Sequence, residues 1–160
     1  MVLVTPYDGS TLSRTALIHA ARASELYGER ALAVTIVPSQ NTSYAREKGW
    51  IGNDEEFDKE TILSRLRGEV KEIAPEAGFE HLVVEKYAQS GMVSNRIRRL
   101  ARNRDTSAIF IGSDKAGHSF IGNDSVGGQL VFEHAYDIAI IRNPLPEAES
   151  GPVKAGDPAQ

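Results

Sequence analysis

The stretch 108-AIFIGSDKAGHSFIGNDSVGG-128 joins an apolar run to a loop that is rich in glycine. The run from Ser107 to Ile111 predicts a β-strand, and Ser125 predicts the start of a helix after the loop. Glycines let backbone N–H groups approach a ligand closely, and the first turn of a helix adds unpaired N–H groups with a partial positive charge. The stretch therefore predicts an α/β fold with an anion-binding site where this strand ends.

Further apolar runs predict the other strands, and amphipathic segments between them predict helices. The predicted strands are Val2–Thr5, Ala31–Val37, His81–Tyr87, Ser107–Ile111 and Ile138–Ile141. The predicted helices are Thr11–Tyr27, Glu55–Ile73, Val93–Asn103 and Ser125–Tyr136. We expect Ser10 and Gly28 to cap the first helix, and Asn53 or Asp54 to begin the second.

The alternation of strands and helices predicts a parallel sheet with right-handed crossovers and helices on both faces. We expect an open, doubly wound, five-stranded sheet with the order 3-2-1-4-5. In such sheets a ligand binds beyond the carboxyl ends of the strands, where the winding reverses. The reversal lies between the first and fourth strands, so the loops Pro6–Ser10 and Gly112–Ser125 should meet at one site.

The connection from Pro38 to Asp54, PSQNTSYAREKGWIGND, has no clear hydrophobic period. An unstructured connection of this length is unusual inside a compact domain, and one explanation is a lid or a binding loop. A surface loop without a binding role is the other explanation. The pattern alone leaves both open.

The composition indicates one globular domain and argues against a disordered or a membrane protein. The chain has 160 residues, of which 41% are hydrophobic and 25% charged, and this is typical of a single buried core. We expect a domain over residues 1–144 and a flexible tail over 145–160, because the tail has too little apolar surface to order itself.

The net charge and the residue types present argue against further classes of protein and of site. A net charge of −4 argues against a surface built for nucleic acid. No run approaches the roughly 18 apolar residues of a membrane span, and the first residues lack a basic leader, so we expect a cytoplasmic protein. The absence of cysteine excludes disulfides and thiolate metal sites, and the four histidines lack metal-ligand spacing.

Several segments resemble the universal stress protein family, over nearly the whole of Val2–Asn143. VLVTPYDGSTLSRTAL resembles the first strand of the family and its Pro-x-Asp-Gly-Ser turn. SGMVSNRI resembles the third helix, which begins with glycine, and IFIGSD resembles the strand that leads into Gly-Ser. SVGGQLVFEHAYDIAIIRN has the spacing of the last helix and strand of the family.

Members of the family that bind ATP carry Gly, two residues, Gly, nine residues, then Gly and Ser or Thr. Aligned on Gly112 and Ser125, the chain has Lys115 and Asp124 where the family has its other two glycines, with eight residues rather than nine between them, so two of the glycines are replaced. A side chain at 115 narrows the space for a phosphate, although Lys115 has a charge that can reach the phosphates. Asp124 places a carboxylate beside the amides that would bind them. The resemblance therefore implies an altered phosphate loop.

The resemblance also implies which residues contact the nucleotide. Pro6, Tyr7 and Asp8 would lie on the adenine side and Ile36 on the second strand. Gly112 and Ser113 would lie under the ribose and phosphates, with Ser125 and Val126 at the start of the helix. The implied ligand is ATP with Mg²⁺, and no metal site belonging to the protein itself is expected. Simpler roles are a turn for Asp8, the core for Ile36 and a helix cap for Ser125.

These features lead to a main hypothesis and two alternatives. The main hypothesis is a non-catalytic stress-response protein that binds an adenine nucleotide and pairs as a homodimer through Ile138–Ile141, an apolar edge strand. The first alternative is a dimeric protein-interaction module of the same fold that binds no nucleotide. Slow ATP hydrolysis is least favoured, because only Asp8 and Asp124 are near enough to the loop to act as a general base.

Overall fold

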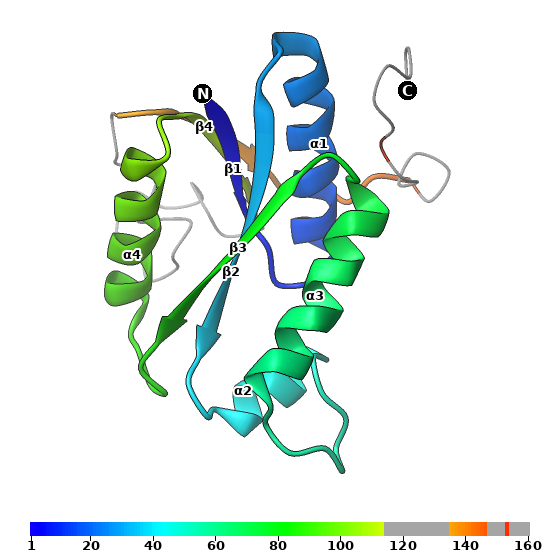
Figure 1. The fold of residues 1–160 in the computed structure, drawn as a ribbon, viewed down its shortest axis with the longest axis vertical. Coiled ribbons are helices and arrows are strands. Elements are labelled where there is room, and N and C mark those ends of the chain that lie inside the picture. The colour runs from blue at the N-terminus through cyan, green and yellow to red at the C-terminus, as the bar shows by residue number, and fades with distance from the viewer. Residues whose placement is uncertain (114–134, 147–152, 154–160) are drawn as a thin grey trace.

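Residues 1–113, 135–146 and 153 are described by the computed structural model of the chain. They form a five-stranded parallel sheet with the order β3-β2-β1-β4-β5 (Figure 1). The strands are β1 (Val2–Pro6), β2 (Arg30–Pro38), β3 (Gly78–Val84), β4 (Thr106–Gly112) and β5 (Asp137–Ile141). The helices are α1 (Thr11–Tyr27), α2 (Thr42–Glu47), α3 (Lys59–Ile73) and α4 (Ser90–Asn103). The predicted fold and strand order are confirmed.

Helices cover both faces of the sheet. α1 and α3 pack on one face and α4 packs on the other (Figure 1). Successive residues of β2 point to opposite faces, and Ala33 and Val34 are both completely buried, in different clusters. This burial on two sides explains why β2 is a continuous apolar run rather than an alternating one.

The ends of α1 follow the predicted caps. The side chain of Ser10 accepts a hydrogen bond from the Ser13 N–H at 3.2 Å. Gly28 takes a left-handed conformation with φ 67°, and its N–H donates to the Ser24 carbonyl. A glycine reaches this conformation without the steric cost that other residues have. The start of α1 is therefore fixed beside the end of β1.

The predicted bounds of three elements are wrong. α4 was expected from Val93 but begins at Ser90. α3 begins at Lys59, and its cap is Asp58 rather than Asn53 or Asp54, because the Asp58 side chain accepts from the Glu60 N–H at 3.2 Å. β3 was expected over His81–Tyr87 but starts at Gly78 and ends at Val84. Its bounds follow from pairing with β2, whose last residue, Pro38, lies opposite Val84.

The connection from Pro38 to Asp54 is not unstructured, because it contains α2. The Asn41 side chain caps this helix by accepting from the Tyr44 N–H at 3.0 Å. Ala45, Trp50 and Ile51 are at most 5% exposed and pack in the core beneath α1 and α3. The buried residues hold α2 against the domain and place it beside the end of β1.

Other predictions concern the C-terminal part of the chain. Most of the predicted helix Ser125–Tyr136 lies outside the described residues, as does most of the expected tail. Within that tail, the Leu145 N–H donates to Thr15 Oγ1 at 3.3 Å, and the Val153 N–H donates to the Ile73 carbonyl at 2.8 Å. In the described ranges no helix has the length and apolar character needed to cross a membrane.

Candidate functional site

A cavity of about 660 Å³ lies at the carboxyl ends of β1, β2, β3 and β4. It includes the point between β1 and β4 where the winding of the sheet reverses. Six of the residues singled out from the sequence line it: Pro6, Tyr7, Asp8, Ile36, Gly112 and Ser113. The other three, Lys115, Ser125 and Val126, lie outside the described residues, and so does Asp124. The structure thus gathers at one cavity every predicted site residue that it describes.

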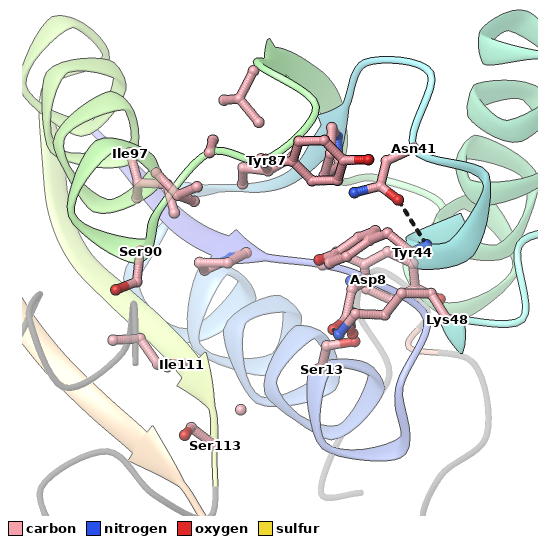
Figure 2. Close-up of a pocket in the computed structure, with 18 of the residues that line it drawn as sticks. Asp8, Ser13, Asn41, Tyr44, Lys48, Tyr87, Ser90, Ile97, Ile111 and Ser113 are labelled. Atoms are coloured by element: carbon pink, nitrogen blue, oxygen red, sulfur yellow. Dashed lines mark hydrogen bonds and ion pairs between the residues drawn. The ribbon is translucent and has the colours of Figure 1, made fainter. Parts of the chain in front are cut away.

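Figure 2 shows the cavity with two contrasting sides. Polar side chains from the β1–α1 turn, from the first turn of α1 and from α2 with its two caps lie on one side: Asp8, Ser13, Asn41, Tyr44 and Lys48. On the other side lie Ile97 and Ile111, which are apolar, together with the hydroxyl residues Ser90 and Ser113. We refer to Asn41, Tyr44 and Lys48 as the α2 rim, and to Ile111, Gly112 and Ser113 as the β4 end.

Asp8 is the most connected polar residue of the site. Its Oδ2 accepts from Lys48 Nζ at 2.6 Å and its Oδ1 accepts from the Ser10 N–H at 2.9 Å. Its own N–H donates to Ser13 Oγ, and its carbonyl accepts from Trp50 Nε1 at 2.8 Å. Burial disfavours the charged carboxylate, but the hydrogen bonds from Lys48 and Ser10 outweigh burial and lower the pKa of Asp8 to about 2. The carboxylate is therefore ionised at neutral pH.

Lys48 follows α2 and completes the ion pair. Burial disfavours its ammonium, but the hydrogen bond to Asp8 and the charge interactions with Tyr44, Asp8 and Glu47 together outweigh burial and raise the pKa of Lys48. The ammonium also lies 5.5 Å from the centre of the Tyr44 ring, a cation–π distance. The Tyr44 ring meets Trp50 edge-on with centroids 5.5 Å apart. Lys48 is thus held as a cation between a carboxylate and an aromatic face.

Tyr7 contributes to the site through its backbone and ring. Its hydroxyl donates to Glu69 Oε1 at 2.7 Å, and Arg14 donates to the same oxygen at 3.1 Å. Burial, followed by the hydrogen bond to Glu69, raises the pKa of Tyr7. The Tyr7 carbonyl accepts from the buried Thr35 Oγ1 at 2.8 Å. These bonds fix the turn after β1 to α3 and β2, so Tyr7 acts in positioning the turn.

Close packing against α1 requires a glycine at position 112. A Cβ at this position would lie 2.3 Å from the Leu12 carbonyl oxygen and 2.8 Å from the Ser13 nitrogen. Real side chains do not approach backbone atoms so closely, so only glycine lets the end of β4 lie against the start of α1. The resemblance implied a contact with the ribose or phosphates here, and the structure adds a packing reason independent of any ligand.

Sequence reasoning missed the residues of the α2 rim and of the β3–α4 loop. Asn41 joins these two segments, because its Nδ2 donates to the Lys86 carbonyl at 2.7 Å. Lys86 lies 5.4 Å from the ring centre of Tyr87, which is 78% exposed at the mouth of the cavity. The spacing from Asn41 to Tyr44 was a capping signal that could have revealed α2. No local pattern indicated that Lys48 meets Asp8.

The structure also limits where a metal could bind. Across the residues that are described, no three His, Cys, Asp or Glu side chains gather as a group able to hold a metal ion. Among the described residues, the polar side chains at the cavity are instead one carboxylate, two ammonium groups, hydroxyls and one amide. Such a set suits an organic ligand with hydrogen-bond donors and acceptors.

Residues 1–123 match the model of the Universal stress protein family. The chain belongs to the universal stress protein family. The predicted resemblance is thereby confirmed. A search of curated protein sequences gave no match to the chain.

Solved structures of other universal stress proteins share the fold. One from Burkholderia pseudomallei is 18% identical, with a TM-score of 0.53, over 89% of this chain and 96% of that one. UspA from Lactobacillus plantarum is 16% identical, with a TM-score of 0.56, over 89% and 97%. A universal stress protein in complex with cAMP is 14% identical, with a TM-score of 0.56, over 88% and 95%. At these identities the similarity establishes the fold alone.

Proposed function

We propose that this universal stress protein binds an adenine nucleotide, with ATP and Mg²⁺ as the expected form, and acts in the stress response without catalysing a reaction. One observation carries the proposal: the cavity at the switch point is lined by all six described residues to which the family resemblance assigns nucleotide contacts. A cytoplasmic location accompanies the proposal.

The chemistry of the lining supports this ligand. Ile36 and the apolar residues of α4 offer a surface on which a purine ring packs, and Asp8 offers an acceptor for its amino group. The β4 end, with Gly112 and Ser113, would take the ribose and the phosphates. The structure of a related universal stress protein in complex with cAMP is consistent with an adenine nucleotide as ligand of this fold.

Isothermal titration with ATP and Mg²⁺, together with a thermal shift, tests the proposal directly. We expect binding heat and a higher unfolding temperature at millimolar ATP, since a ligand that binds only the folded state stabilises it. Neither heat nor shift at that concentration would contradict nucleotide binding. It would favour the alternative of an interaction module with no nucleotide.

A second experiment addresses the altered phosphate loop. The double variant Lys115→Gly/Asp124→Gly restores the two motif glycines. If these departures weaken the site, the double variant should bind ATP at least about tenfold more tightly, since each charge effect amounts to about 1 kcal/mol. Equal affinity would show that the departures leave binding unaffected.

We also propose a homodimer that pairs through β5. In the described residues β5 pairs with β4 alone, and its apolar residues Ile138–Ile141 are only partly buried. An apolar edge strand leaves backbone groups available for pairing with another chain. Light scattering at micromolar concentration should give twice the mass of one chain, and a monomer would contradict this proposal.

A further inference from the structure

We propose that Tyr87, in the loop between β3 and α4, stacks its ring on the base of the bound nucleotide. The inference rests on the nucleotide binding proposed above and adds a ligand contact from a loop to which the family resemblance assigns none. The contact would contribute affinity for a planar base without a choice among bases.

Tyr87 combines strong exposure with a place in the cavity wall. Its side chain lines the cavity and the residue is 78% exposed. Figure 2 shows its ring at the edge of the cavity, near Asn41. The other large apolar residues that are strongly exposed in the described ranges, Met1, Leu26, Tyr27 and Met92, do not line the cavity. A ligand that fills the cavity therefore meets a ring whose apolar surface is still in contact with water.

The other two tyrosines of the cavity already use their rings in the protein. Tyr7 is 2% exposed and belongs to the core beneath α1 and α3. Tyr44 meets Trp50 edge-on and has the Lys48 ammonium near its face. Among the described lining residues, Tyr87 thus offers the most exposed aromatic ring.

The fold places Tyr87 along the wall where the base is expected to pack. The purine is proposed to pack on Ile36, near the carboxyl end of β2. Two residues later, Pro38 pairs with Val84, the last residue of β3, and the Ser39 N–H donates to the Val84 carbonyl at 2.9 Å. Tyr87 follows Val84 by three positions. Ile36, Pro38, Val84 and Tyr87 all line the cavity, so the wall continues from the expected base position to the ring.

The loop that carries Tyr87 is held in place before a ligand binds. The Ala88 N–H donates to the Glu85 carbonyl at 3.0 Å and closes a turn around Lys86 and Tyr87. Asn41 Nδ2 donates to the Lys86 carbonyl at 2.7 Å and ties this turn to α2. A contact that is arranged in advance loses less conformational entropy on binding.

The Lys86 ammonium lies against one face of the Tyr87 ring. Its Nζ is 5.4 Å from the ring centre, a cation–π distance. Because the ammonium covers this face, the opposite face is the one that can stack on a base. Every nucleic-acid base has a planar face, so stacking adds affinity without reading the hydrogen-bonding groups of the base.

Calorimetry with ATP and Mg²⁺ tests the contact in the wild type and in the variants Tyr87→Ala, Tyr87→Phe and Tyr87→Leu. We expect Tyr87→Ala to weaken ATP binding at least about fivefold, because removal of an aromatic stacking partner typically costs that much or more. Tyr87→Phe keeps the ring and should bind ATP within about twofold of the wild type. Tyr87→Leu keeps an apolar side chain without a ring, and its affinity should lie between those of the other two variants.

Tyr27→Ala provides the matched control. Tyr27 is 68% exposed at the end of α1 and is not among the residues that line the cavity. The change removes a similarly exposed ring from another place, so the affinity for ATP should stay at the wild-type value. Because both tyrosines are mostly exposed, thermal unfolding without ligand should give nearly the same temperature for all variants.

The results distinguish the stacking contact from nucleotide binding itself. If the wild type binds ATP and Tyr87→Ala binds it equally tightly, or if Tyr27→Ala loses as much affinity as Tyr87→Ala, the contact is wrong while nucleotide binding stands. If Tyr87→Phe loses as much affinity as Tyr87→Ala, the hydroxyl makes the contact and stacking is wrong. If Tyr87→Leu binds like the wild type, an apolar side chain suffices and stacking is again wrong. If the wild type binds no ATP, the proposed function is wrong and the contact with it.

Discussion

The β4 end and the α2 rim hold the two sides of the cavity by different forces. At the β4 end, the backbone of Gly112 packs directly on the backbone of α1. At the α2 rim, charged and amide side chains bridge separate loops, as in the ion pair between Asp8 and Lys48 and the bond from Asn41 to Lys86. The first side depends on steric fit and tolerates no added atom. The second depends on partly exposed polar contacts and can be changed residue by residue.

The largest effect is expected from adding one methyl group at the β4 end. Gly112→Ala would place a Cβ 2.3 Å from the Leu12 carbonyl oxygen, so β4 and α1 would have to separate. Overpacking of this kind should lower the free energy of unfolding by about 3 kcal/mol. Chemical denaturation measures the change.

Gly68→Ala provides the matched control for Gly112→Ala. Gly68 lies within α3, and an added Cβ there meets nothing within 4 Å. Alanine has the higher helix propensity, so this variant should be stabilised by about 0.5–1 kcal/mol. A similar loss in both variants would show that position 112 has no special packing.

At the α2 rim, Asn41→Ala should have the next largest effect. The change removes the cap of α2 and the bond from Asn41 Nδ2 to the Lys86 carbonyl. Loss of a cap and a side-chain hydrogen bond should cost about 1–2 kcal/mol in the free energy of unfolding. Asn53→Ala, at an exposed position before α3, should change stability by less than about 0.5 kcal/mol. Equal effects of the two changes would contradict the role of Asn41.

The ion pair between Asp8 and Lys48 should contribute less to the free energy of unfolding than the contacts of Asn41. A double-mutant cycle with Asp8→Asn and Lys48→Met isolates the interaction between the two side chains. Because both are about one-third exposed and screened by water, we expect a coupling energy of about 0.5–1 kcal/mol. Asparagine can still accept the Ser10 N–H, so the cycle tests the charge pair rather than the turn. A coupling energy of zero would mean that the pair contributes nothing to stability.

The same pair should give a defined dependence on pH. The pKa of Asp8 is lowered from its usual 3.8 to about 2. A lowered carboxyl pKa stabilises the folded state above pH 4, and this contribution is lost as the pH falls through 2. The difference in unfolding free energy between wild type and Asp8→Asn should therefore shrink between pH 4 and pH 2. A difference that stays constant over this range would contradict the ion pair as its source.

Prediction from sequence succeeded where the signals were local. Ser10 and Gly28 mark the ends of α1 because capping acts within a few residues, and the apolar runs locate the strands. It failed where contacts between residues far apart in the sequence determine the bounds of an element. The end of β3 at Val84 is set by pairing with Pro38, and an apolar run cannot show its partner.

The same division applies to the candidate site. Asp8 and Gly112 were predicted because each follows a strand at the switch point. α2 was missed because six residues are too few to establish a helical period. Lys48 was missed because only the fold brings it to Asp8. The family pattern identified one partner of the ion pair, and the structure was needed to find the other.

The bond between Trp50 and Asp8 has a practical consequence. Trp50 is the single tryptophan of the chain, and its indole N–H donates to the backbone carbonyl of Asp8, which lines the cavity. Its ring also packs edge-on against Tyr44 of the α2 rim. Indole fluorescence responds to changes in hydrogen bonding and local polarity. The protein thus has an intrinsic fluorophore next to the cavity, and we expect the proposed ligand to change the emission of Trp50 when it binds.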